Sequence, residues 1–259
     1  MTILITGATD GLGRALAERF AAEGQSLILH GRDAGKLAKT ADSLPGKDVR
    51  TVVADLGELA QVRRLAAEVR DSTDRLDVLV SNAGIGSGEP DGRHRRTSAD
   101  GHELRFAVNY LAGFLLTLEL LPLLHRVVNV ASLGQHPIDF DDLMIERDYS
   151  GTRAYGQSKL SQIMSGFELA TRAPEVAVNS LHPGTYMPTK IVLQEIGHSV
   201  DTIESGVDAV RRLAVDNTGT GRFFDRTREA TANAQAYDAD ARRELWRRSL
   251  ELVGHPGID

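Results

Sequence analysis

A glycine-rich turn near the N-terminus limits what this chain can fold into more than any other feature. A β-branched and aliphatic run, Thr2 to Ile5, leads into the turn, and a helical pattern from Arg14 to Glu23 follows it. Glycines let the backbone approach a pyrophosphate, and the amino end of a helix supplies amide donors and a positive dipole end. The spacing, Gly-x-x-x-Gly-x-Gly, is a variant of the dinucleotide pattern, so an ordinary glycine-rich βα turn stays an alternative. The candidate phosphate-binding residues are Gly7, Thr9, Asp10, Gly11, Leu12 and Gly13.

Short apolar runs alternate with helical patterns from one end of the 259-residue chain to the other. Strands that are short, apolar and separated by helices are typical of a buried parallel sheet. The alternation, without repeats or linkers, predicts one domain over residues 1–259, a Rossmann-type doubly wound α/β fold. Its parallel sheet should have about seven strands, with helices on both faces. Beyond the first strand, strands are predicted at 26–30, 50–54, 76–81, 126–131, 176–181 and near 223–224, and helical patterns begin at Arg14, Ala99 and near Tyr155 and cover 203–215 and 238–253.

The composition of the chain limits which classes of molecule it is expected to bind. The formal net charge of −6 gives no general attraction to nucleic acid or to a membrane surface. The chain has no cysteine, which rules out disulfides and thiolate chemistry. No apolar run is expected to reach membrane-spanning length, and the N-terminus does not resemble a signal peptide. We therefore expect a cytoplasmic protein that binds neither nucleic acid nor membrane.

Polar and small residues follow the predicted strands, at the carboxyl ends where a parallel sheet binds ligands. After the second strand comes Gly31-Arg32-Asp33, in which Arg32 suits the 2′-phosphate of NADP and Asp33 is expected to cap the next helix. An Arg32 that is merely exposed is the alternative. Asp55 can accept a hydrogen bond from an adenine amino group, whereas Asn82 either faces the crevice or braces the sheet from within. The further cofactor-site candidates after the third, fourth and sixth strands are Asp55, Leu56, Asn82, Ala83, Gly84, Pro183 and Gly184.

Tyr155 and Lys159 stand four residues apart in a helical pattern and therefore share one helix face. An ammonium group beside a phenol favours the phenolate and lowers the pKa of a tyrosine from about 10. Such a tyrosine can exchange a proton with a substrate oxygen near neutral pH. The pair alone is weak evidence for a catalytic site, because a solvated helix face often carries the same spacing. The predicted nucleotide-binding turn earlier in the chain makes the catalytic interpretation stronger.

Jointly, the motifs resemble those of the short-chain dehydrogenase/reductase family. In chain order they are Thr6-Gly7-x-x-x-Gly11-x-Gly13, Asn82-Ala83-Gly84, Asn109, Ser132, Tyr155-x-x-x-Lys159 and Pro183-Gly184. The stretches 128–132, 138–143 and 154–160 resemble the retinol-dehydrogenase-like branch and its bacterial relatives. The resemblance covers most of the chain, and the motifs are specific as a set rather than singly.

The resemblance implies a hydride transfer between a nicotinamide cofactor and a carbonyl or alcohol. Tyr155 would be the acid/base, and Ser132 would hydrogen-bond the same substrate oxygen. Lys159 would lower the pKa of the tyrosine and bind the nicotinamide ribose, and Asn109 would hold a water that links Lys159 to solvent. No metal is needed. The histidines show no metal-ligand spacing and are interpreted as loop or surface residues: His30, His94, His136 and His182.

We therefore expect an NADPH-preferring carbonyl reductase or alcohol dehydrogenase that uses NADP(H) before NAD(H). Its partner would be a small-molecule carbonyl or alcohol, and a homodimer or homotetramer is left open. A non-catalytic NADP sensor is the alternative from another class, although such relatives usually lose the tyrosine or the lysine. An epimerase or dehydratase fits less well, because those relatives usually carry a larger C-terminal region.

The stretch from Thr185 to Val200 is predicted to be a mobile substrate lid. Its apolar residues partly follow a helical spacing, and Pro188 and Gly197 interrupt it. A lid of this kind would exclude water and add an apolar wall, which favours a small to medium, largely apolar substrate. The alternative is that the apolar stripe packs on the sheet as core.

Overall fold

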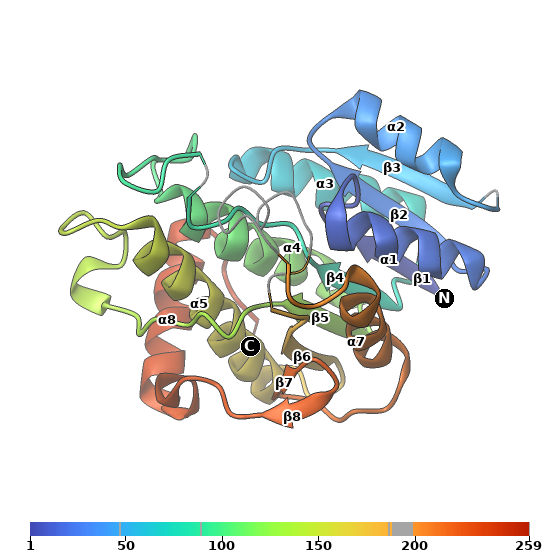
Figure 1. Cartoon of the computed structure of the whole chain (residues 1–259). Helices are drawn as coiled ribbons and strands as arrows, with labels where there is room; N and C mark the ends of the chain where they lie inside the picture. The colour runs from blue at the N-terminus through green and yellow to red at the C-terminus, as the bar shows by residue number, and fades with distance from the viewer. Residues whose placement is uncertain (47, 89, 186, 188–198, 259) are drawn as a thin grey trace.

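A central eight-stranded sheet organises the part of the chain that the computed structural model describes, residues 1–46, 48–88, 90–185, 187 and 199–258 (Figure 1). The strand order is β3-β2-β1-β4-β5-β6-β7-β8. All neighbours are parallel except β7 and β8. The order reverses between β1 and β4, and ligands of such sheets bind where it reverses. The strands are β1 (Thr2–Ile5), β2 (Ser26–Gly31), β3 (Val49–Val53), β4 (Val78–Ser81), β5 (Arg126–Val130), β6 (Ala177–His182), β7 (Arg222–Asp225) and β8 (Arg228–Ala230).

Helices cover both faces of the sheet (Figure 1). Residues of α1, α2 and α7 share one core with the sheet, and residues of α3, α4, α5 and α8 share the other. The helices are α1 (Gly11–Ala22), α2 (Ala34–Ser43), α3 (Leu59–Ser72), α4 (Ala112–Leu120), α5 (Gly151–Arg172), α7 (Ile203–Val215) and α8 (Ala239–Val253). A π-helical turn, η1 (Phe106–Leu111), precedes α4, and 3₁₀ turns lie at η2 (Leu121–Leu123), η3 (Phe140–Asp142) and η4 (Ala234–Tyr237).

The alternation of side chains along β1 explains the two cores. Ile3 and Ile5 pack with the α1 and α7 side, whereas Leu4 packs with the α3, α4 and α5 side. All three side chains are fully buried. A strand in the middle of a parallel sheet is covered on both faces, so most of its positions are apolar. This is why the apolar runs of the sequence predicted the parallel strands.

The predicted Rossmann-type α/β fold in a single domain is confirmed, with two differences in detail. The sheet has eight strands and not about seven, because the short strand β8 pairs with β7 in a hairpin. Its residues are exposed or half-buried and show no apolar pattern. The helix expected from Ala99 begins at Leu104, because Gly101, with a φ of 83°, lies in a turn closed by a bridge between Thr97 and Glu103.

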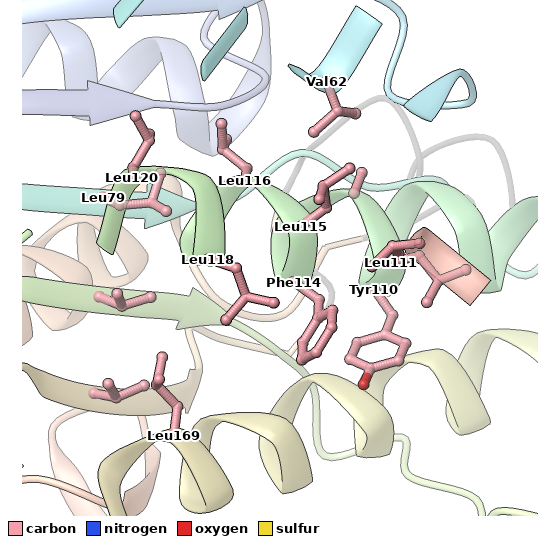
Figure 2. Packing of buried hydrophobic residues seen from close by; sticks show 14 of the residues in the cluster. Val62, Leu79, Tyr110, Leu111, Phe114, Leu115, Leu116, Leu118, Leu120 and Leu169 are labelled. Carbon is pink, nitrogen blue, oxygen red and sulfur yellow. The ribbon is translucent and has the colours of Figure 1, made fainter. Parts of the chain in front are cut away.

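The helix that carries Asn109 runs through the larger core (Figure 2). Leu115 and Leu116 point to the α3 side, where Val62 lies, and Tyr110 and Phe114 point the other way, towards α5. Packing on all sides explains why this helix is apolar all round. The stretch Phe106–Leu123 would be long and apolar enough to cross a membrane, contrary to the expectation from the sequence, but 67% of it is buried in this fold.

Candidate active site

The glycine-rich turn folds tightly back on itself between β1 and α1. Gly7 has a φ of 68°, and a Cβ on it would lie 2.9 Å from the Cα of Ala83. A Cβ on Gly13 would lie only 2.1 Å from the carbonyl oxygen of Gly7. Asp10 caps α1 by accepting a hydrogen bond from the amide of Gly11 at 2.8 Å. The turn fits a pyrophosphate, because its glycines allow the backbone a close approach and the amino end of α1 lies directly behind it.

Asn82 holds the end of β4 against the end of β1. Its Nδ2 donates to the carbonyl oxygen of Thr6 at 2.9 Å and to that of Gly7 at 3.3 Å. In return, the Thr6 hydroxyl accepts from the amides of Asn82 at 2.9 Å and Ala83 at 3.0 Å. Of the two roles left open for Asn82, its contacts are those of a brace. Thr6, which the sequence indicated only as part of a motif, is the residue that Asn82 is hydrogen-bonded to across the two strands.

The residues predicted for the adenosine end lie together at the ends of β2 and β3. Arg32 is exposed, and Asp33 caps α2 as expected, accepting from the amide of Lys36 at 2.9 Å. A Cβ on Gly31 would lie 2.7 Å from Cγ2 of Thr9, so β2 passes close beside the glycine-rich turn. After β3, Asp55 is half-buried and its Oδ1 accepts from the amide of Gly57 at 2.8 Å. Leu56 beside it is buried in the core.

Lys159 is held rigidly beneath Tyr155 on α5. Its Nζ lies 5.8 Å from the centre of the Tyr155 ring and donates to the carbonyl oxygen of Val130 at 2.8 Å. Only 5% of the lysine is exposed, whereas Tyr155 is half-buried. Burial penalises the ammonium and lowers the pKa of Lys159 to about 8. At neutral pH the lysine still carries its charge, close to the phenol.

Asn109 lies in the π-helical turn η1 and connects three elements. It exchanges two hydrogen bonds with the backbone of Ile85, at 2.8 and 3.1 Å, and donates to the hydroxyl of Ser158 at 3.0 Å. A Cβ on Gly84 would lie 3.2 Å from Asn109 Oδ1 and 3.6 Å from Lys159 Nζ. The end of β4, the asparagine and the lysine therefore meet at one point. Such π turns occur frequently at functional sites.

Ser132 follows β5 and is half-buried, facing the same region as Tyr155. Its Oγ accepts from the amide of Gly134 at 3.0 Å. A Cβ on Gly134 would lie 3.4 Å from Ser132 Oγ and 3.8 Å from Cε1 of Tyr155. The serine and the tyrosine thus flank the same glycine, and a substrate oxygen that reaches one hydroxyl is near the other.

The chain after β6 passes Pro183 and Gly184 as expected, and both are buried. Gly184 is packed tightly: a Cβ there would lie 3.2 Å from the Cβ of Asp201. Thr185 donates its amide to Asp201 Oδ2 at 2.7 Å and accepts from the Asp201 amide at 3.0 Å. Most of the predicted lid, residues 186 and 188–198, lies outside the described residues. The lid therefore stays a prediction.

Two of the four histidines are not where the sequence predicted them. His30 on β2 and His182 on β6 are 2% and 7% exposed, because both strands are covered on both faces. His94 and His136 are exposed, as predicted. Among the described residues, no group of three or more His, Asp or Glu side chains is placed to hold a metal ion.

A buried ionic cluster, which sequence reasoning missed, joins the loop after Gly84 to the start of α5. Arg105 and Glu103, both fully buried, lie 3.7 Å apart. The guanidinium donates to the carbonyl oxygens of Gly86 and Ser87, each at 2.7 Å, and to the hydroxyl of Tyr149 at 2.6 Å. That hydroxyl donates to Glu103 at 3.1 Å. Burial is the main cause that raises the pKa of Tyr149 to about 12, so the phenol stays protonated.

The low pKa of Lys159 gives a testable titration. The chain has five lysines, so the 13Cε resonances of a 13C-lysine-labelled sample are few. In the cofactor-free protein, one of them should titrate near pH 8, since burial disfavours the ammonium. The unfolded chain holds that proton up to about pH 10.5, so between pH 8 and 10.5 the unfolding free energy should rise with pH. Lys159→Met should lack the resonance; a spectrum with no titration below pH 9.5 would contradict the assignment.

Comparisons with known proteins identify the family of this chain. The family model described as short chain dehydrogenase matches residues 1–196. The chain belongs to the short-chain dehydrogenase family. A protein of Streptomyces sp. (strain C5), provisionally named daunorubicin C-13 ketoreductase DnrU, is 35% identical over 275 residues, 98% of this chain and 92% of that protein. Human retinol dehydrogenase 13 is 31% identical over 290 residues, 98% of this chain and 84% of its own length.

These relatives place the dehydrogenase in the retinol-dehydrogenase-like branch, as its motifs predicted. A crystal structure of an uncharacterized protein from Mycobacterium paratuberculosis has a TM-score of 0.81 and 30% identity, covering 98% of this chain and 93% of that one. The RhlG/NADP active-site complex of Pseudomonas aeruginosa has a TM-score of 0.70 and 26% identity, covering 86% and 93%. The protein is thus a nucleotide-binding oxidoreductase of the Rossmann fold, from a family that uses nicotinamide cofactors.

Proposed function

We propose that this dehydrogenase is an NADP(H)-dependent carbonyl reductase or alcohol dehydrogenase in which Tyr155 is the acid/base. The observation that carries the proposal is the meeting of four side chains beside the end of β4. Lys159 lies beneath Tyr155, Asn109 joins Lys159 at Gly84, and Ser132 flanks the tyrosine from β5. The glycine-rich turn follows the neighbouring strand β1, so the phosphate-binding and proton-transfer groups lie at the carboxyl ends of adjacent strands, where parallel sheets bind ligands.

The nicotinamide, when bound, supplies or accepts the hydride. The chain's own residues do the rest. In reduction, the Tyr155 hydroxyl donates its proton to the carbonyl oxygen, and in oxidation the phenolate removes it from the alcohol. The Ser132 hydroxyl donates a hydrogen bond to the same oxygen and keeps it in reach. The buried ammonium of Lys159 favours the phenolate and is placed to bind ribose hydroxyls. Asn109 keeps the loop after β4 in position through its two hydrogen bonds to Ile85.

The preference for NADPH rests on Arg32, which is exposed at the end of β2 with a glycine before it. A guanidinium there can bind a 2′-phosphate in a bidentate, charge-assisted way. Arg32→Leu should weaken NADPH binding by about ten- to a hundredfold and leave NADH binding almost unchanged. Isothermal titration calorimetry with both cofactors measures this.

A matched control for that experiment is Arg75→Leu. It removes an exposed arginine just before β4, at the amino ends of the strands, whereas Arg32 lies at their carboxyl ends. Equal affinity of the wild-type protein for the two cofactors would contradict the assignment of Arg32. A carboxylate at Gly31 is a poor way to reverse the preference, because its Cβ would lie 2.7 Å from Thr9 Cγ2.

The substrate in this proposal is a small to medium, largely apolar carbonyl or alcohol. The names of two relatives, a provisional daunorubicin ketoreductase and a retinol dehydrogenase, support a largely apolar molecule rather than a small acid. The test is NADPH consumption over a panel of aldehydes, ketones and quinones, with NADH in parallel. Cofactor binding without turnover on any of them would favour the sensor function instead. A cytoplasmic location and a homodimer or homotetramer remain predictions.

A further inference from the structure

The ring of His30 connects the phosphate-binding turn to the chain after β3. It lies near the end of β2 and is 2% exposed. Its Nδ1 accepts a hydrogen bond from the amide of Gly7 at 3.3 Å, and its Nε2 is 3.0 Å from the carbonyl oxygen of Ala54. The backbone oxygen of His30 also accepts from the amide of Ala8 at 2.9 Å. Two successive amides of the turn are therefore held by one residue.

The two ring contacts require a neutral imidazole with its proton on Nε2. A carbonyl oxygen only accepts, so the nitrogen that faces Ala54 must donate, and the Gly7 amide donates, so Nδ1 must accept. In a protonated ring, Nδ1 would also carry a hydrogen, which would face the amide hydrogen of Gly7, and the hydrogen bond between them would be lost. Burial is the main cause that lowers the pKa of His30 below its usual 6.5. The hydrogen bond to Ala54 and the charge of Asp55 raise this pKa, and the charge of Arg32 lowers it.

The position of Gly7 depends on contacts from two sides. Asn82 Nδ2 approaches its carbonyl oxygen at 3.3 Å, and His30 receives its amide hydrogen. Gly7 has a left-handed φ of 68°, so without these partners its peptide groups could rotate to other conformations. The carbonyl of Gly7 in turn lies against Gly13, the third glycine of the turn. A change at Gly7 would therefore reach the amino end of α1.

We propose that His30 is a positioning residue for the phosphate-binding turn, and that a proton on its ring weakens dinucleotide binding. The residue does not touch the cofactor; it acts through Gly7. The inference deepens the proposed function and rests on it for the identity of the ligand. Its consequence is a cofactor affinity that falls once the pH drops below the lowered pKa of His30, for a reason internal to the protein.

The test measures the Kd of NADH by isothermal titration calorimetry between pH 5.5 and 8. NADH is chosen because it lacks the 2′-phosphate of NADPH, whose own proton equilibrium near pH 6 would obscure the effect. For the wild-type protein, Kd should be constant above pH 7 and rise by about two- to tenfold as the pH falls well below 6.5, the range of one lost hydrogen bond.

Two variants separate the loss of the hydrogen-bond acceptor for Gly7 from the protonation of the imidazole ring. His30→Leu fills the space without a polar atom, so its Kd should be raised about two- to tenfold already at pH 7.5 and should no longer depend on pH. His30→Asn keeps an acceptor near the position of Nδ1 but cannot be protonated. Its Kd should stay within about twofold of wild type at pH 7.5 and be flat down to pH 5.5. His125→Asn, an exposed histidine just before β5, should behave as wild type.

The outcomes are distinguishable. Equal Kd values for wild type and His30→Leu at pH 7.5 would overturn the proposal and leave the proposed function standing. If His30→Leu does not fold, the pH profile of His30→Asn decides, and a profile equal to that of wild type overturns the proposal. If the folded wild-type protein binds neither NADH nor NADPH, the proposed function fails, and this inference fails with it.

Discussion

Tyr155→Phe should lower kcat by about 10²- to 10⁴-fold and leave the affinity for NADPH nearly unchanged. The variant keeps the ring above Lys159 and removes only the hydroxyl that would give its proton to the carbonyl oxygen. Ser132 would still hydrogen-bond that oxygen but has no buried ammonium beneath it to favour its ionised form. Steady-state kinetics on the best substrate of the panel, with calorimetry for NADPH, measure both quantities.

Tyr237→Phe is a control that also removes a tyrosine hydroxyl, but away from the candidate active site. Tyr237 is half-exposed in η4 and packs beside Phe167. Its kcat should match that of wild type. Lys159→Met should differ from Tyr155→Phe by weakening cofactor binding as well as turnover, because in the proposed function the lysine also binds the nicotinamide ribose. If Tyr155→Phe keeps more than a tenth of wild-type activity, Tyr155 is not the acid/base.

Arg105→Met should lower the unfolding free energy by about 3–5 kcal/mol, the largest effect on stability that we predict. The arginine and Glu103 are both fully buried, and removing the cation leaves the carboxylate without its charge partner. The carbonyl oxygens of Gly86 and Ser87 would also lose a donor. Urea unfolding followed by circular dichroism measures the change, provided that the slope with denaturant stays constant.

The cluster around Arg105 offers its own controls. Tyr149→Phe removes only a hydroxyl and should cost less than Arg105→Met. Adding Glu103→Gln to Arg105→Met should cost less than the sum of the two single changes, since the pair shares one interaction. Arg14→Met breaks an exposed ion pair with Glu18 and should have little effect. A loss below 1 kcal/mol for Arg105→Met would show that the cluster does not hold the loop and α5 together.

The same cluster connects the loop after β4 to the start of α5. The amide of Gly151, the first residue of α5, donates to the carbonyl oxygen of Gly92 at 2.8 Å. Arg105 fixes the other part of this loop, and Tyr155 follows one turn after Gly151. Asn109 bonds Ile85 at the start of the loop, so two side chains four residues apart on one helix both contact this loop.

Local patterns were sufficient for the features that depend on neighbours in the chain. The parallel strands could be predicted because a sheet covered on both faces requires an unbroken apolar run, as in Ile3, Leu4 and Ile5. The turn that begins at Gly7 could be predicted because its conformation excludes side chains. The placement of Tyr155 over Lys159 follows from the pitch of a helix, which any four-residue spacing reproduces.

Only the tertiary structure decided what distant residues do to each other. His30 looks like a surface histidine in the sequence, and its proposed role follows from the amide of Gly7 and the carbonyl of Ala54, which come after two other strands. Arg105 interrupts an apolar pattern, and the loop carbonyls that surround its charge come from outside its helix. The pKa of Lys159 depends on burial under β5. The sequence alone determined where the chain turns and which faces are apolar, whereas long-range contacts determined which polar groups are buried and paired.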